Sequence, residues 1–252
     1  MSDYLLDSVR LFQSGKTLDA YRFCRRALAL DPTKAEAWGF IVSLASAAGF
    51  ESAALQAATR STRLSPMQTD LLSAAASAYA KFGHFADAVC FQKRIICASP
   101  WHDMHWLRLS EWAFTALQFD VAESAANKVI RLGANIHQGL SALADVAYRQ
   151  DQFLDAERYL KKVLCLQPVD PSSLTRLGLV GERIGVSTRA VSHCKRAVML
   201  MPDVAEYHYN LGCVSSSAGD SSLAIESFVD CLRRDRFHLA ARNNLGNMRR
   251  GS

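Results

Sequence analysis

The sequence predicts an all-α protein of the α-solenoid type, in which pairs of antiparallel helices are stacked one after another. Three observations predict this fold. An alanine recurs seven times at a constant spacing of 34 residues, five of the six prolines keep the same period, and glycines mark a third phase of it. A period of this length is typical of repeat architectures, in which each unit packs only on its neighbours.

The phases are read directly from the sequence. The alanines are Ala20, Ala54, Ala88, Ala122, Ala156, Ala190 and Ala224. The prolines are Pro32, Pro66, Pro100, Pro168 and Pro202, and the glycines are Gly15, Gly49, Gly83, Gly185 and Gly219. A fourth phase holds the large apolar residues Trp38, Leu72, Trp106, Leu140 and Leu174.

Each phase has a physical reason. Between a glycine and the next proline, as in residues 86–100, apolar residues lie three and four apart, which is the pattern of a helix. The glycine allows a turn conformation that other residues resist, so one helix ends there. The proline marks the boundary before the next helix. The alanine is expected where two helices cross closely. Each unit is therefore predicted to be a pair of antiparallel helices.

Seven units and a final helix account for the whole chain, which we expect to form a single domain over residues 1–252. In the last segment Leu245 and Gly246 repeat the pattern of Leu211 and Gly212, so this segment begins an eighth unit and covers an otherwise exposed apolar face. The predicted units are residues 1–34, 35–68, 69–102, 103–136, 137–170, 171–204 and 205–238, followed by a capping helix over residues 239–252.

Two units depart from the pattern. The fourth has Leu117 in the glycine phase and Ala134 in the proline phase, so Gly133 is expected to end its second helix. The sixth has Gly181 between Gly178 and Gly185, which should weaken its first helix. We expect the array to bend or flex most near these two units.

These phases resemble the pattern of the tetratricopeptide repeat family, and the resemblance covers residues 1–252 nearly end to end. It implies a right-handed superhelix whose first helices line a concave groove for partner proteins. It does not identify the partner, because repeat arrays share architecture without sharing function. The resemblance rests on Trp38, Tyr79, Leu211, Gly212, Phe228, Ala27, Ala197, the seven periodic alanines and the five periodic prolines.

The resemblance also implies which residues face the groove, since fixed positions of each first helix point inward in this family. In the second and third units these positions hold mostly small residues, apart from Phe40. From the fourth unit onward they are rich in arginine and tyrosine, which often dominate binding energy. The candidate groove residues are Arg108, Glu111, Phe114, Asp145, Tyr148, Arg149, Arg176, Glu182, Arg183, Tyr209, Asn210 and Asn244. The alternative is that they are ordinary polar residues on a wet surface.

Two binding modes known in the family require particular residues at these positions. The chaperone-binding mode clamps a terminal carboxylate with lysine and asparagine, but Leu5 and Val9 stand at those places. The glycosyltransferase mode uses one asparagine per unit, and here only Asn210 and Asn244 match. The first mode is disfavoured, and at most a fragment of the second is present.

Composition favours a cytoplasmic protein. Half of the residues are apolar and about a fifth are charged, and the seven cysteines form no C-x-x-C pair. The N-terminus is acidic and lacks the apolar core of a secretory signal. No run approaches the roughly 18 apolar residues of a membrane span.

Nothing in the sequence favours catalysis, a cofactor or a metal. The glycines of G-L-V-G-E-R-I-G (178–185) fall on helix phases, and no strand precedes them as a phosphate loop requires. The stretch W-H-D-M-H-W (101–106) looks like a metal clip but lies between two units, where Asp103 is placed to cap the next helix. A zinc ion held by His105 and His137 is a minor alternative.

The whole net charge of +5 lies at the C-terminal end. Residues 233–252 hold six arginines and one aspartate, a difference of +5. Cations near a helix C-terminus are favoured by the helix dipole, and nucleic-acid binding ranks below that interpretation because it normally uses a wider basic face. The arginines are Arg233, Arg234, Arg236, Arg242, Arg249 and Arg250.

The sequence therefore predicts a non-catalytic scaffold that binds an extended peptide or helix of another protein, with acidic side chains meeting the groove arginines. The alternative is a substrate-recognition arm of a larger enzyme, of the bacterial glycosyl- or sulfotransferase type, whose catalytic domain lies outside this chain. Nucleic acid is a disfavoured partner.

Overall fold

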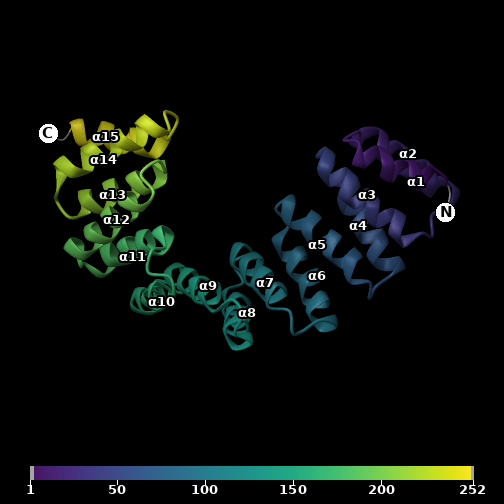
Figure 1. Cartoon of the computed structure of the whole chain (residues 1–252), viewed down its shortest axis with the longest axis horizontal. Coiled ribbons are helices and arrows are strands. Elements are labelled where there is room, and N and C mark those ends of the chain that lie inside the picture. The colour runs from purple at the N-terminus through teal and green to yellow at the C-terminus, as the bar shows by residue number, and fades with distance from the viewer. Residues whose placement is uncertain (1–2, 251–252) are drawn as a thin grey trace. The chain divides into compact units, whose positions relative to one another are not determined.

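The computed structural model describes residues 3–250, and in this range every regular element is an α-helix. Fifteen helices follow one another in the described range, and successive helices pack as pairs (Figure 1). The chain divides into two compact units at the link between Ala134 and Asn135, at the end of the fourth predicted repeat. The prediction of an all-α solenoid is confirmed.

The first compact unit contains α1 to α8. They are α1 (Asp3–Gln13), α2 (Thr17–Leu30), α3 (Ala35–Ala48), α4 (Glu51–Leu64), α5 (Thr69–Lys81), α6 (Phe85–Ala98), α7 (Asp103–Thr115) and α8 (Phe119–Leu132). The second contains α9 (Ile136–Arg149), α10 (Phe153–Leu166), α11 (Pro171–Ile184), α12 (Ser187–Leu200), α13 (Ala205–Ser217), α14 (Ser221–Arg234) and α15 (Leu239–Arg250). Each predicted repeat thus corresponds to one helix pair, except that α9 begins one residue before the predicted boundary at 137, and α15 follows alone.

The periodic alanines lie where the two helices of a pair approach most closely. All seven have no exposed surface. In the first pair the Ser8 hydroxyl donates a hydrogen bond to the Ala20 carbonyl at 2.6 Å. In the sixth pair a Cβ added at Gly178 would lie 3.0 Å from the Ala190 carbonyl oxygen. The alanine phase is therefore explained by backbone proximity, as predicted.

The final helix α15 packs against the pair before it. Its residues Ala241 and Leu245 lie in one buried cluster with Ala224, Phe228 and Cys231 of α14. This packing covers the apolar face of α14 that another repeat would otherwise cover.

The glycine phase holds the left-handed turns between the two helices of each pair. Its five glycines have φ angles between 78° and 86°, and Gly133 ends α8 at φ 86°, as predicted. The fourth and fifth pairs keep the same turn without glycine, since Leu117 has φ 59° and Asp151 has φ 58°. A side chain with a Cβ resists this conformation.

We expect Leu117→Gly to raise the free energy of unfolding by about 0.5–1 kcal/mol, because it removes the left-handed strain at this position. The greater conformational entropy of glycine in the unfolded chain offsets only part of that stabilisation. Little packing is lost, since Leu117 is 62% exposed. The midpoint of urea unfolding measures the change. The control is Leu154→Gly in α10, where the leucine is 69% exposed. Leu154→Gly should destabilise the protein by up to about 1 kcal/mol. Equal shifts of the urea midpoint in both variants would contradict the expected relief of strain at Leu117.

Gly181 does not interrupt α11, which runs unbroken from Pro171 to Ile184. The helix begins with a strong cap, because the Asp170 carboxylate accepts hydrogen bonds from the backbone N–H groups of Ser172 and Ser173. A Cβ at Gly181 would lie 3.2 Å from the Cβ of Ala190, so the glycine allows close packing of α11 on α12. The expected weakening is therefore not visible as a break in the helix.

Candidate functional site

The predicted groove residues lie on first helices in both compact units. Arg108, Glu111 and Phe114 lie on α7 in the first unit. The other nine lie in the second unit, on α9, α11, α13 and α15, and all twelve side chains are half-buried or exposed. The second unit carries the larger set, and its residues form two pockets.

The first pocket lies between α9 and α11 and has a volume of about 200 Å³. Three predicted residues, Asp145, Tyr148 and Arg176, contribute to its wall. The rest of the lining is apolar and consists of Ala144, Leu160, Leu179 and Val180. The site thus offers room for an apolar side chain beside charged groups.

An ion pair lies at this pocket, with Arg176 Nη1 at 3.2 Å from Asp145 Oδ1. Burial raises the pKa of the Asp145 carboxyl, and the nearby Arg176 charge opposes that shift. The carboxylate therefore depends on Arg176 for its stabilisation. The charge of Arg176 is already compensated within the chain, which the sequence did not indicate.

Aromatic contacts hold the neighbouring residues. The rings of Tyr148 and Phe153 meet edge to face, with centroids 5.6 Å apart. The Arg183 guanidinium lies 5.4 Å from the centroid of the same Phe153 ring, a cation–π distance. Phe153, which the sequence reasoning missed, therefore connects two predicted residues from α9 and α11.

The second pocket, of about 290 Å³, lies among α11, α13, α14 and α15. Of the predicted residues, it brings together Glu182 and Asn244. The Ser217 hydroxyl donates to the Glu182 carboxylate, and Asn244 Nδ2 lies 3.7 Å from Cys213 Sγ. Sequence reasoning missed Cys213 and Ser217, although both occupy inward-facing positions, because small side chains were not singled out there.

Tyr209 is fixed beside this second pocket. Its hydrogen bond with Cys213, together with burial, raises the pKa of Tyr209 to about 12. Its ring lies 4.6 Å from the ring of His238 and 6.0 Å from that of Phe228. Asn210, the next residue, is half-buried on the same helix.

The three residues of α7 form a separate cluster within the first unit. Burial raises the pKa of Glu111, while the positive charge of Arg108 acts against that shift. The ring of Phe114 meets that of Phe119 edge to face, with centroids 6.0 Å apart. Their part in a groove stays a prediction.

The stretch 101–106 is a joint between α6 and α7. The ring centroids of His102 and His105 lie 5.5 Å apart. Burial lowers the pKa of His105, and the nearby charges of His102 and Arg108 lower it further. Between residues 3 and 250 no three histidine, cysteine or acidic side chains are grouped as metal ligands. A third ligand that would support a zinc ion between His105 and His137 is therefore not found among the described residues.

The predicted capping role of Asp103 is wrong by one position. His102 occupies the cap position of α7 and makes no side-chain cap hydrogen bond. Asp103 is the first helical residue, and its carboxylate accepts from the backbone N–H of Met104 at 2.9 Å. An acidic group still lies in the first turn, where the helix dipole favours it.

A side chain of the following helix closes three of the links between repeats. Trp106 Nε1 donates to the Pro100 carbonyl at 2.8 Å, and Trp38 Nε1 donates to Pro32 at the same distance. In the seventh repeat His208 Nε2 lies 2.8 Å from the Pro202 carbonyl. Each hydrogen bond spans six residues, so the large residues of the fourth phase fasten the joints as well as filling the core.

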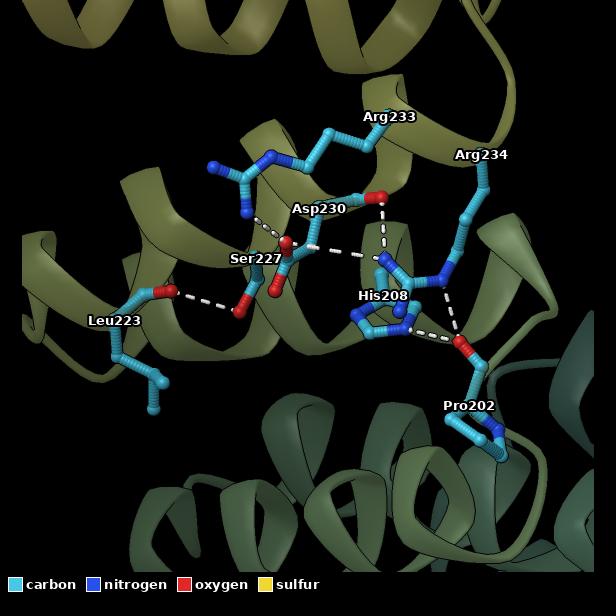
Figure 2. A network of polar contacts seen from close by, with 7 residues as sticks. All are labelled: Pro202, His208, Leu223, Ser227, Asp230, Arg233 and Arg234. Atoms are coloured by element: carbon cyan, nitrogen blue, oxygen red, sulfur yellow. Dashed lines mark hydrogen bonds and ion pairs between the residues drawn. The ribbon is translucent and has the colours of Figure 1, made fainter.

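The arginines at the end of α14 are engaged within the chain, as Figure 2 shows. Arg233 Nη1 lies 2.8 Å from Asp230 Oδ1, and Arg234 donates to the carbonyls of Asp230 and Pro202. These contacts support the structural interpretation of the basic end. The side chains of Arg249 and Arg250 lie outside the described residues.

None of the helices between residues 3 and 250 has the length and apolar character needed to cross a lipid bilayer. The segment 178–185 that superficially suggested a phosphate loop is helical up to Ile184, and Gly185 forms its left-handed end at φ 86°.

Comparison with known proteins supports the fold. A family model described as tetratricopeptide repeat matches residues 205–238. No curated protein matches the sequence. A solved tetratricopeptide repeat protein from Parabacteroides merdae aligns with a TM-score of 0.73 and 13% identity, covering 98% of this chain and 97% of that one.

Two further structures share the fold at low identity. The C-terminal part of a repeat protein of this kind from Cytophaga hutchinsonii aligns with a TM-score of 0.70 and 13% identity, covering 96% of this chain and 99% of that one. YrrB, described as having an unusual peptide-binding site, aligns with a TM-score of 0.53 and 16% identity, covering 74% of this chain and 96% of that one. The resemblance stated from the repeat pattern is confirmed.

Proposed function

We propose that this chain, which has the tetratricopeptide repeat fold, is a non-catalytic scaffold that binds a segment of another protein on the first helices of its second unit. Proteins with this fold generally act in protein–protein interaction. The observation that carries the proposal is the pocket between α9 and α11, where an apolar floor lies beside the Asp145–Arg176 ion pair. YrrB, which shares the fold, has a peptide-binding site.

The lining of this pocket suits one apolar side chain of the partner. Its apolar wall comes from three helices, and Tyr148 adds an aromatic ring that keeps both an apolar face and a polar end. Covering the wall would remove apolar surface from water, which is favourable at about 25 cal/mol per Å². The anchor of the bound segment is therefore a leucine-sized residue.

The ion pair favours an acidic residue next to that anchor. Asp145 binds Arg176 weakly, because burial disfavours the charged form of the Asp145 carboxyl. A carboxylate brought by the partner competes for the guanidinium and can bind it in a bidentate manner. Partner binding would then replace an internal ion pair with an intermolecular one.

The second pocket would hold the backbone of the same segment. Asn244, which lines this pocket, carries an amide group that both donates and accepts hydrogen bonds. Glu182 accepts from Ser217 and retains further acceptor capacity for a peptide N–H. These contacts would give affinity without depending on the partner's side chains.

The test uses fluorescence anisotropy with labelled synthetic peptides that alternate leucine with glutamate, and a leucine–lysine series as the sign-reversed probe. We expect the acidic series to bind and the basic series to fail. Arg176→Gln should weaken acidic-peptide binding about tenfold, and Asp145→Asn should strengthen it, because the competing carboxylate is gone.

A matched control is Arg158→Gln, which removes an exposed arginine on α10 that is paired with Asp155 at 2.7 Å. It should leave affinity unchanged. Helicity is measured for every variant. If Arg176→Gln and Arg158→Gln bind the acidic peptides equally well, with helicity intact, the assignment of this pocket is wrong.

A further inference from the structure

The exposed apolar side chains of the second unit gather at one edge. The link edge comprises the three links between helix pairs (167–170, 201–204 and 235–238) with the adjoining helix ends, and the turn edge comprises the turns within pairs. Seven exposed large apolar residues lie at the link edge: Leu166, Val169, Met199, Leu200, Met201, Phe237 and Leu239.

The turn edge differs sharply. In the described part of the second unit it exposes one large apolar side chain, Leu154, near the start of α10. Single exposed apolar residues are normal on protein surfaces, but a set confined to one edge marks an interaction site. Val169, Met199 and Phe237 are 70%, 80% and 84% exposed, so packing within the chain does not explain them.

Two of the three links are held together, so their side chains form one surface. Figure 2 shows Arg234 at the end of α14 and His208 of α13 directed at the same carbonyl oxygen, that of Pro202. The ring of His238 in the next link lies 3.3 Å from a carboxylate oxygen of Glu206 on α13. The links before α13 and α15 are therefore fixed relative to each other.

The link edge is also positively charged. The last two turns of α10, α12 and α14 with their links, residues 161–170, 195–204 and 229–238, hold seven lysines and arginines against four aspartates, a difference of +3. Three of the aspartates, Asp170, Asp230 and Asp235, accept hydrogen bonds within the chain. Four cations make no ion pair in the described part of the chain: Lys162, Lys195, Arg196 and Arg236.

We propose that this link edge docks on an anionic lipid surface. Its apolar side chains would enter the boundary between headgroups and acyl chains, and its cations would meet the lipid phosphates. This combination of apolar insertion and positive charge is what peripheral binding to anionic membranes requires. A row of projecting side chains suits a deformable lipid surface, whereas a protein partner would need a matching concave face.

The first unit, taken by itself, also exposes large apolar side chains at its links. Leu30, Met67 and Trp101 lie at or beside its three links and are 68%, 74% and 78% exposed. Trp101 comes from the stretch that joins α6 to α7, and tryptophan is the residue enriched where membranes meet water. Exposed apolar side chains therefore occur at the links of both units, but the first unit also exposes Leu18, Phe50 and Leu117 at its turns, so their confinement to the link edge is a property of the second unit.

The experiment is co-sedimentation of the full chain with vesicles of phosphatidylcholine alone or mixed with phosphatidylglycerol. We expect binding to the mixed vesicles, weakened by salt, and at least about tenfold less to phosphatidylcholine alone. The link-edge variant carries Val169→Ser, Met199→Ser and Phe237→Ser, and should bind the mixed vesicles about tenfold less. The turn-edge control carries Leu18→Ser, Leu117→Ser and Leu154→Ser, and should bind like the wild type.

Three outcomes would overturn the proposal. The first is absence of binding to the mixed vesicles. The second is an equal loss in the link-edge and turn-edge variants, with helicity intact in both. The third is self-association of the wild type in sedimentation velocity that the link-edge variant abolishes, because the edge would then join two copies of this chain. A further variant with Lys162→Gln, Arg196→Gln and Arg236→Gln should lose the preference for the anionic lipid.

Discussion

Replacing Phe228 with alanine is expected to destabilise the second unit by about 3–5 kcal/mol. Phe228 is the largest fully buried side chain of the described chain, with 1% of its surface exposed. Its ring fills the space left by Gly212, where an added Cβ would lie 2.6 Å from the ring. It also lies in one cluster with Ala241 and Leu245 of α15. Phe228→Ala therefore leaves a cavity and removes the floor on which the last helix packs.

Urea unfolding followed by circular dichroism measures the loss, and amide hydrogen exchange locates it. The backbone amides of α15 should exchange fastest in the variant, because α14 provides most of the packing of that helix. The control is Phe237→Ala, which removes the same side chain from an 84% exposed site and should change stability by less than about 0.5 kcal/mol. Similar losses in both variants would contradict the packing argument.

Ala88→Leu is expected to destabilise the first unit by about 1–3 kcal/mol or more, because the added atoms must enter a close crossing of α5 and α6. Ala88 has no exposed surface, and Ala75 and Ala76 of α5, the helix paired with α6, are equally buried. The added side chain has no exposed space to enter, so the two helices must move apart.

The control lies in the same helix two residues earlier. Ala86 is exposed, so Ala86→Leu adds the same atoms to the same helix without a steric conflict. Thermal unfolding of both variants separates the effect of packing from that of helix propensity. If Ala86→Leu and Ala88→Leu lower the melting temperature equally, the crossing is not as close as the structure indicates.

The fold could be predicted because each phase of the repeat reflects one backbone requirement. The alanines mark close crossings and the glycines mark left-handed turns, and neither depends on the other side chains nearby. Leu117 and Asp151 show the boundary of that reasoning. They adopt the glycine conformation because the surrounding helix pair imposes it, and a local preference cannot reveal this.

The candidate site could be predicted only in part. The positions of Asp145 and Arg176 on their helices predicted that both side chains point toward the groove. Their ion pair depends on how far α9 and α11 are offset along their axes, and a position within one helix does not indicate that offset. Phe153 belongs to a second helix, where the family pattern assigns no groove residue, yet it contacts both Tyr148 and Arg183. Small inward-facing residues such as Cys213 were not predicted to belong to the site, because their residue type alone does not indicate binding.

The six-residue hydrogen bonds that close the links also bear on how such a chain can change length. Trp38, Trp106 and His208 each reach a carbonyl that lies six positions earlier, so one inserted residue in the link would move the donor away from its acceptor. The side-chain hydrogen bonds that span a left-handed turn, such as those from Ser8 to Ala20 and from Ser110 to Ala122, join residues within the paired helices and not residues of the turn. Viable insertions and deletions are therefore expected at the turns or as whole repeats, and the link length should stay fixed. Seven alanines at an unbroken spacing of 34 residues are the record that this constraint would leave.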